Sequence, residues 1–389
     1  MFQRTLATTA RRLARQFPVL TIVGPRQAGK TTLARMTFPD HAYVNLEDPD
    51  ARALASADPQ GFIARYPDPL ILDEIQRVPE LLSSIQVEVD RAPQSGRYIL
   101  TGSHQSALHA AISQSLAGRT ALLQLLPLSL PELSTAAPDD LDELLLRGFL
   151  PRVHDANQDP YQAYRAYFQT YVERDLRQIM NVKNLALFQR FMRLCAGRIG
   201  QLFNASALAN EVGVSYHTIE HWISALEASY LVFRLPPYFE NFNKRWVKTP
   251  KLYFTEPGLA TYLLGIETSA QLSRDPLRGG LFENLVIMEL YKARVHRGRD
   301  PGLYFVRDRQ GNEIDALLTR GRELIAVEIK SAQTYHSQMA TKLNLLRRWV
   351  SPRPVEGYVV YGGEGEQAIG ENHLVPYLRT ATIATDTST

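Results

Sequence analysis

The fold is decided by one contiguous segment, Val19–Thr31, which reads VLTIVGPRQAGKT. Its beginning is an apolar run typical of a buried strand, and its end fits the pattern G-x-x-x-x-G-K-[ST]. In that pattern, backbone N–H groups and the N-terminus of the following helix surround a phosphate. We therefore predict a phosphate-binding loop whose nucleotide contacts come from Gly24, Pro25, Arg26, Gln27, Ala28, Gly29, Lys30, Thr31 and Thr32.

Two side chains of this loop carry the chemistry. Lys30 can neutralise the β and γ phosphate oxygens, and the Thr31 hydroxyl can bind Mg²⁺. The predicted cofactors are therefore ATP and Mg²⁺.

Short apolar runs alternate with helical stretches through residues 1–133. Strands that alternate with helices predict an α/β fold with a parallel sheet covered on both faces. The runs are Val19–Val23, Ala42–Leu46, Pro69–Leu72, Arg97–Leu100 and Ala121–Leu126.

Polar residues follow two of these runs. Asp73 and Glu74 come directly after Pro69–Leu72, and the carboxyl end of a parallel strand is where such acids meet the phosphates. We expect Asp73 to hold Mg²⁺ and Glu74 to polarise the attacking water. Ser103 is a candidate for contact with the γ-phosphate or the water, and Arg119 for stabilising charge in its own or a neighbouring subunit. A capping serine and a surface arginine are the alternatives.

Composition bounds the class of protein. The 389 residues are 45% hydrophobic and 21% charged, which suits a globular chain of two or three domains. The single cysteine excludes an internal disulfide and favours the cytoplasm. No apolar run is long enough for a membrane span. Arg4, Arg11, Arg12 and Arg15 lie near the N-terminus without acids, which fits a folded basic helix as well as a targeting segment.

The middle of the chain, residues 143–235, is predicted to be helical. Ser206–Glu227 has helix-turn-helix proportions, but its second helix contains no Lys or Arg with which to contact DNA. Basic residues lie instead on residues 236–254, at Lys244, Arg245, Lys248 and Lys251, interleaved with Phe242 and Trp246. This segment is a DNA-contacting wing, a solvated surface or a lid packed beside the nucleotide-binding core.

A second cluster of candidate site residues lies near the C-terminus. Two strand-like runs flank Gly321-Arg322, and a two-residue turn starting with Gly is typical of a hairpin. If Arg320 pairs with Glu323, Asp315 lies opposite Glu328, and Lys330 shares their face. Glu283 lies on an apolar helix stripe and needs a partner, so we expect it to join them. Two strand carboxylates could bind Mg²⁺ or Mn²⁺.

Several segments together resemble the bacterial and archaeal AAA+ ATPases that carry a C-terminal domain of unknown function. They include GPRQAGKTT, LILDEIQ, ILTGSHQS, LAGR, LPLSLPEL, YVERDL, LFENLV and GNEIDALL. The resemblance implies an AAA+ core over 1–133, a helical and winged-helix region over 143–255 and a restriction-endonuclease-like domain over 256–379. A disordered tail is expected over 380–389.

The resemblance also implies roles for the C-terminal cluster. Glu283, Asp315, Glu328 and Lys330 resemble a PD-(D/E)XK nuclease site, in which Asp315 and Glu328 bind the metal and Lys330 orients water. One departure is Glu256-Pro257, where the family shows Asp-Thr. Cleavage of DNA stays open, because folds outlive their activities.

Two functional hypotheses follow. The first is a Mg²⁺-dependent ATPase with a regulatory or remodelling role on DNA, assembled as a homo-oligomer and with a possible protein partner. The second is a nucleotide-switched module that binds DNA or protein, as a component of a defence or toxin–antitoxin system, with slow hydrolysis and no cleavage.

Overall fold

The computed structural model describes residues 2–103, 112, 114–176, 182, 184–238 and 247–385. The chain forms two compact units. Unit 1 comprises Met1–Leu128, Ala228–Tyr230 and Val295–Arg299, and unit 2 comprises Ser129–Glu227, Leu231–Arg294 and Asp300–Thr389. The domain boundaries expected near residues 133, 255 and 379 stay predictions.

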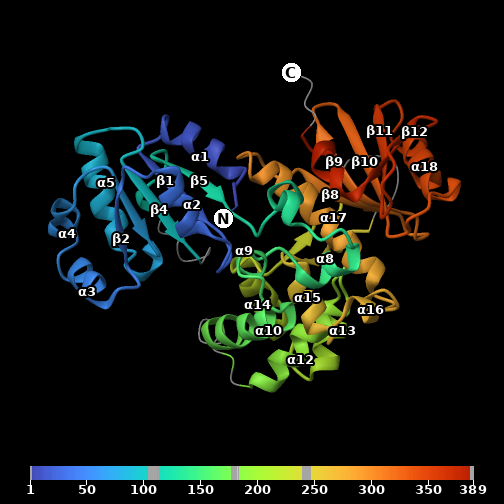
Figure 1. Cartoon of the computed structure of the whole chain (residues 1–389), viewed down its shortest axis with the longest axis horizontal. Helices are drawn as coiled ribbons and strands as arrows, with labels where there is room; N and C mark the ends of the chain where they lie inside the picture. Colours follow the sequence, from blue (N-terminus) through green and yellow to red (C-terminus); the bar gives the residue numbers. More distant parts are fainter. Residues whose placement is uncertain are drawn as a thin grey trace. The chain divides into compact units, whose positions relative to one another are not determined.

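Unit 1 contains a parallel sheet of five strands in the order β2-β3-β4-β1-β5, drawn in blue and teal in Figure 1. The predicted parallel α/β core is therefore confirmed. Every predicted run forms a strand; β1 has the predicted ends, and the other four have one or both ends shifted by one or two residues. The strands are β1 (Val19–Val23), β2 (Ala42–Asn45), β3 (Leu70–Asp73), β4 (Tyr98–Gly102) and β5 (Thr120–Gln124).

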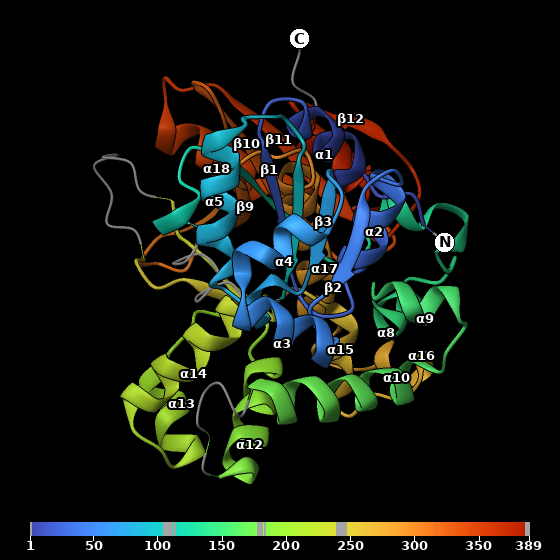
Figure 2. The same ribbon diagram turned by 90° about the vertical axis from the view of Figure 1, so that its left-hand side faces the viewer.

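Helices cover both faces of this sheet (Figure 2). They are α1 (Leu6–Ala14), α2 (Lys30–Thr37), α3 (Pro49–Ala57), α4 (Pro59–Arg65) and α5 (Leu81–Arg91), with a 3₁₀ turn η1 (Ile75–Arg77) after β3. One hydrophobic cluster joins α1 and α2 to the sheet through Leu6, Leu20 and Leu33. A separate cluster joins α4 and α5 to it through Phe62 and Ile85.

Unit 2 begins with helical structure, as the sequence predicts for residues 143–235, except that the end of this range forms the strand β6. Its elements up to the last sheet are α7 (Leu130–Leu133), η2 (Ser134–Ala136), α8 (Leu141–Arg147), α9 (Pro151–Asp155), α10 (Pro160–Tyr167), the π-helix η3 (Phe168–Leu176), α12 (Leu185–Ala196), α13 (Ala205–Val212), α14 (Tyr216–Ala228), β6 (Val232–Leu235), β7 (Lys251–Phe254), α15 (Pro257–Leu263), α16 (Ser269–Leu272) and α17 (Arg278–Val295). The last residues of α14 and α17 belong to unit 1.

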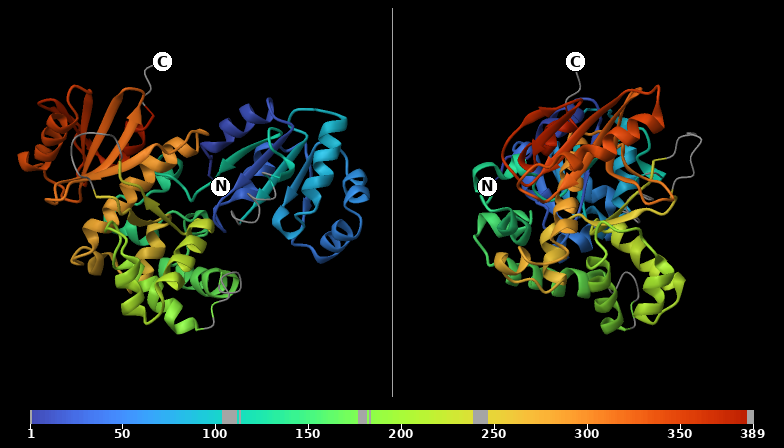
Figure 3. Two further views of the ribbon diagram at one scale, coloured as in Figure 1. Left: turned by 180° about the vertical axis from the view of Figure 1, so that it is seen from behind. Right: turned by 90° about the vertical axis from the view of Figure 1, so that its right-hand side faces the viewer.

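Unit 2 ends in a mixed sheet of six strands, ordered β12-β13-β11-β10-β9-β8 and drawn in orange and red in Figure 3. Its core packs against α18 through Leu343 and Leu346. The elements are β8 (Leu303–Arg307), β9 (Glu313–Arg320), β10 (Glu323–Lys330), η4 (Ser337–Ala340), α18 (Thr341–Val350), β11 (Val355–Tyr361), β12 (Gln367–Ile369), β13 (Asn372–Pro376), η5 (Tyr377–Arg379) and α19 (Thr380–Ile383).

The predicted hairpin is confirmed, because Arg320 pairs with Glu323 and the antiparallel register runs back to Ala316 opposite Val327. The predicted tail is partly wrong. Residues 380–383 form α19, in which Thr380 donates a hydrogen bond to the Tyr377 carbonyl and Ile383 is buried. Its end, residues 386–389, lies outside the described residues.

Candidate functional site

The phosphate-binding loop connects β1 to α2. Gly24 has φ +151° and Gly29 has φ +91°, a conformation that residues with a Cβ rarely adopt. A Cβ on Gly24 would lie 1.9 Å from the carbonyl oxygen of Leu125, the residue directly after β5. Glycine is therefore required at this position by both the backbone angle and the space.

Lys30 is the first residue of α2 and is buried. Its Nζ donates hydrogen bonds to the carbonyls of Gly24 and Pro25, at 3.1 and 2.8 Å. Burial lowers the pKa of Lys30 to about 8, although the nearby acids Glu74 and Asp73 act in the opposite direction. The ammonium thus lies against the loop that is predicted to bind phosphate.

Asp73 ends β3 and is almost fully buried. Its carboxylate accepts hydrogen bonds from the Thr31 hydroxyl at 2.9 and 3.1 Å, from Tyr43 Oη at 2.9 Å and from the Thr101 hydroxyl. The predicted neighbours Thr31 and Asp73 are thus brought together. Tyr43 and Thr101 were missed, although Thr101 lies near the end of a predicted strand, where such contacts were expected.

Glu74 has φ +58°, an unusual value for a residue with a side chain. Its carboxylate accepts hydrogen bonds from the Ser103 hydroxyl at 3.1 and 3.2 Å, and from the Gln76 amide. The Glu74 N–H donates to the Thr101 hydroxyl at 3.2 Å. Backbone strain is often retained at functional sites, and here two polar side chains orient the carboxylate.

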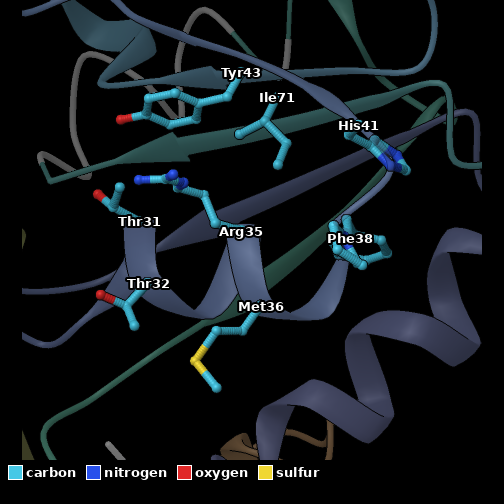
Figure 4. A pocket seen from close by; sticks show the side chains of 9 residues that line it. Thr31, Thr32, Arg35, Met36, Phe38, His41, Tyr43 and Ile71 are labelled. Atoms are coloured by element: carbon cyan, nitrogen blue, oxygen red, sulfur yellow. The ribbon is translucent and has the colours of Figure 1, made fainter.

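A cavity of about 540 Å³ lies beside Thr31 (Figure 4). The guanidinium of Arg35 lies over the ring of Tyr43, 4.9 Å from its centroid. Burial, followed by the charge of Asp73, raises the pKa of Tyr43, so its hydroxyl stays a hydrogen-bond donor to Asp73. The remaining lining residues are Thr32, Met36, Phe38, Pro39, His41 and Ile71.

Arg119 lies away from this group. It directly precedes β5, whose first residue pairs with Val19, so it is at the amino edge of the sheet while the loop follows the carboxyl edge. Strand β1, which separates the two edges, is about 13 Å long at 3.3 Å per residue. Its guanidinium binds Asp90 at 2.6 Å and is one-third exposed. Arg119 and the phosphate-binding loop therefore lie at opposite edges of the sheet.

In the C-terminal sheet, Lys330 Nζ lies 2.9 Å from Glu328 and 3.4 Å from Asp315. Asp315 also accepts a hydrogen bond from the Ile329 N–H. Burial, followed by the charge of Asp315, raises the pKa of Glu328 to about 8. The structure therefore brings Asp315, Glu328 and Lys330 together, as the hairpin count predicts.

Glu283 has a different partner from the one expected. Its carboxylate accepts hydrogen bonds from Lys251 Nζ, at 2.6 Å, and from the Tyr253 hydroxyl. Lys251 also binds Glu313 at 2.8 Å and is only 2% exposed. Lys251 and Tyr253 are partners that the sequence did not indicate, while the charge of Asp315 also acts on Glu283, whose pKa is raised mainly by burial. Within the described part of the chain, no group of three or more His, Cys, Asp or Glu side chains could hold a metal ion.

The same contacts correct the interpretation of the basic ribbon. Lys251 belongs to β7 and is buried, because two carboxylates compensate its charge, whereas Lys248 is exposed. Phe242, Lys244, Arg245 and Trp246 lie outside the described residues. In the helix-turn-helix segment, Tyr216, His217 and His221 are exposed on α14.

Glu256 and Pro257, which depart from the family pattern, form a regular helix start. Glu256 is the N-cap of α15, and Pro257 occupies the first turn, where its missing N–H has no cost. The Glu256 carboxylate accepts hydrogen bonds from Phe149 N at 2.8 Å and Tyr164 Oη at 2.9 Å. Burial raises the pKa of Glu256. The structure thus gives this acid a structural role inside unit 2.

Comparison with known proteins agrees with the loop and the sheet. Residues 16–134 match the AAA domain, residues 138–270 a domain of unknown function (DUF8612) and residues 278–379 another (DUF4143). The N-terminal part is therefore an AAA-type P-loop ATPase domain. The nuclease-like character expected for the C-terminal part is not confirmed by these matches.

Two relatives define the family. The chain is 33% identical over 338 residues to Mb2031c of Mycobacterium bovis and to Rv2008c of Mycobacterium tuberculosis, both named as uncharacterized proteins. The alignments cover 85% of this chain and 74% of each relative. The chain belongs to the family of these mycobacterial proteins.

Similar solved structures include the Walker-type ATPase PABY2304 of Pyrococcus abyssi and AMPPCP-bound DnaA from Aquifex aeolicus. The first has a TM-score of 0.40 at 14% identity and covers 66% of this chain and 94% of its own. The second has a TM-score of 0.29 at 15% identity and covers 57% and 85%. No helix in the described residues is long and apolar enough to cross a membrane.

Proposed function

We propose that the protein binds ATP and hydrolyses it in a Mg²⁺-dependent reaction. The observation that carries this proposal is the contact between the Thr31 hydroxyl and the Asp73 carboxylate, at 2.9 Å, directly beside the phosphate-binding loop. A hydroxyl and a carboxylate are hard oxygen ligands of the kind that Mg²⁺ prefers, so these two residues fit the ion. Mg²⁺ held there supplies positive charge to the β and γ phosphate oxygens.

The other residues of this group act on the phosphates and the attacking water. Lys30 contributes its ammonium to the β and γ phosphates, and the loop N–H groups bind the remaining oxygens. Glu74, oriented by Ser103 and Gln76, polarises the attacking water. Tyr43 and Thr101 hold the Asp73 carboxylate in place. Together with Thr31, these residues make five side chains that donate hydrogen bonds to Asp73 or Glu74, and all of them belong to unit 1.

The test is calorimetric titration of ATP into the full chain and into its Lys30→Ala variant, with Mg²⁺ present. A charge-assisted hydrogen bond contributes about 1.5–3 kcal/mol, so we expect affinity to fall about 10- to 150-fold. The exposed Lys248→Ala variant is the control. Equal ATP affinity of Lys30→Ala and the parent protein would show that this loop does not bind the phosphates of ATP through Lys30.

Turnover of ATP with Mg²⁺, compared with an EDTA-treated sample, tests hydrolysis itself. Tight binding without turnover would favour the second hypothesis, a nucleotide-switched binding module. We infer that turnover serves a regulatory or remodelling task on DNA in the cytoplasm. This part of the proposal is supported by the resemblance of the whole chain, and stimulation of turnover by DNA tests it.

Arg119 is proposed to act across a subunit boundary in a homo-oligomer. The support is that Arg119 is partly exposed and lies at the amino edge of the sheet, away from the phosphate-binding loop of its own subunit. We expect specific turnover to rise with protein concentration in the parent protein, and this rise to disappear in Arg119→Ala while light scattering shows the same assembly. Asp90→Asn, which removes the partner of Arg119, is the control for a merely structural ion pair. Full activity in a monomer would exclude the role.

For the C-terminal cluster we propose a nuclease-like arrangement that binds DNA or a protein and does not cleave DNA. The support is that Lys330 already compensates Asp315 and Glu328, while Lys251 compensates Glu283. DNA cleavage that depends on Mn²⁺ and disappears in Asp315→Ala, with ATP turnover unchanged, would contradict this proposal and restore the metal site.

A further inference from the structure

Helix α1 has two faces with different roles. Leu6, Thr9, Ala10 and Ala14 are buried and hold the helix on unit 1. The opposite face is exposed and follows the spacing i, i+3, i+4, i+7 and i+8, which places its residues in one stripe. We call it the α1 basic face; it lines a surface hollow of about 450 Å³ and consists of Thr8, Arg11 and Arg12 of α1, its C-cap Arg15 and the next residue, Gln16.

The three arginines of this face carry uncompensated charge. Helix α1 contains no acidic residue, and no salt bridge joins Arg11, Arg12 or Arg15 to a carboxylate in the described residues. Elsewhere in unit 1, Arg77, Arg97 and Arg119 do have carboxylate partners.

Like charges one turn apart destabilise a helix by about 0.2–0.5 kcal/mol per pair. The helix dipole offsets part of this cost for cations in the last turn. The dipole does not require three cations on one face of the helix. Binding of an external anion is therefore the simpler explanation for the grouping of Arg11, Arg12 and Arg15.

We propose that the α1 basic face binds the phosphate backbone of duplex DNA. A guanidinium offers a planar pair of donors that matches a phosphate, and it stays charged at any physiological pH. Arg11 and Arg15 are separated by about 6 Å along the helix axis, from 1.5 Å per residue. Two phosphate steps of one DNA strand span about 6.8 Å along the duplex axis.

The composition of the face distinguishes DNA from other anionic partners. A membrane-surface helix needs Trp, Phe or Leu beside its basic residues, but the apolar residues of α1 are buried in unit 1. A protein interface needs an apolar centre, which Thr8 and Gln16 do not supply. Backbone contacts carry no sequence information, so the binding is expected to be independent of sequence.

This inference deepens the DNA association proposed above by naming its surface. The test uses the full chain and a fluorescent DNA duplex of about 30 base pairs, with binding followed by anisotropy between 50 and 200 mM salt, near the range in which phosphate contacts dominate. The variant is Arg11→Gln/Arg12→Gln/Arg15→Gln, because glutamine keeps helix propensity. The matched control is Arg65→Gln, an exposed arginine in the last turn of α4.

We expect the triple variant to bind DNA at least tenfold more weakly at the lowest salt concentration. Each lost phosphate contact should lower the slope of log affinity against log salt by about 0.9, so the slope should fall by about 2 to 3. Arg65→Gln should bind like the parent. Circular dichroism and ATP turnover without DNA should be unchanged in both.

Three results would overturn the inference. The first is absence of DNA binding by the parent at 50 mM salt, and the second is equal DNA binding by the parent and the triple variant. The third is a triple variant that keeps its DNA affinity but loses binding to vesicles that contain phosphatidylserine. If ATP turnover is absent from the parent while DNA binding responds to the variant, the proposed ATPase fails and this surface stands. If turnover is present and DNA binding is insensitive, the reverse holds.

Discussion

Replacement of Glu74 by glutamine is expected to lower the turnover number for ATP by a factor of about 10²–10⁴, the range that a positioned acid or base contributes. Glutamine has the same shape and can still contact Ser103, but it carries no charge with which to polarise water. Asp73 and Thr31 are untouched, so ATP affinity should change by less than threefold. Steady-state phosphate release and calorimetric titration measure the two quantities on the same preparation.

The control for this change is Glu80→Gln, which removes the same charge from an exposed residue before α5 that makes no side-chain cap. It should leave turnover unchanged. Equal turnover in Glu74→Gln and the parent would move the catalytic role to another residue. A parallel loss of ATP affinity would mean instead that Glu74 supports the loop and not the water.

Replacement of Lys251 by methionine is expected to lower the free energy of unfolding by about 3–5 kcal/mol, the cost of breaking a buried ion pair from one side. Methionine fills a similar volume, so the loss is electrostatic. The charges now balance, because Lys251 binds Glu283 and Glu313 while Arg307 binds Glu313 at 3.1 Å. Without Lys251, the Tyr253 hydroxyl is the one donor to Glu283 that remains among the described residues. Urea unfolding followed by tryptophan fluorescence measures the loss.

Two further variants separate charge from packing. The exposed Lys248→Met should be neutral within about 0.5 kcal/mol, as for most surface substitutions. Lys251→Met combined with Glu283→Gln removes the uncompensated carboxylate as well, so part of the lost stability should return. A Lys251→Met protein as stable as the parent would show that the pair contributes nothing, and a double variant less stable than the single one would mean that packing dominates.

The phosphate-binding loop and the hairpin were predictable because their geometry depends on contiguous residues. Gly24 and Gly29 supply backbone angles, the apolar run of β1 supplies a strand, and the loop between them needs no distant partner. Likewise, the two-residue turn at Gly321 sets the register that brings Asp315 and Glu328 to one face, since side chains alternate with a period of two.

The partner of Glu283 was not predictable in the same way. Its apolar helix stripe correctly indicated a buried acid, and burial of an acid correctly indicated a counter-charge. The sequence, however, offered several lysines, and Lys251 stood in a segment that was interpreted as an exposed ribbon. Lys251 lies 32 residues before Glu283 in the chain, and the two side chains meet because β7 packs near α17.

The amino-acid sequence by itself determined the α/β class, the phosphate-binding loop, the acids at the end of β3 and the hairpin of the C-terminal sheet, because each follows from local backbone geometry and residue periodicity. The tertiary structure decided which charges meet. It placed Tyr43 and Thr101 on Asp73, Lys251 on Glu283, and Arg119 at the far edge of the sheet. Those contacts depend on the distances between elements far apart in the chain, and ion-pair energies fall steeply with distance and exposure.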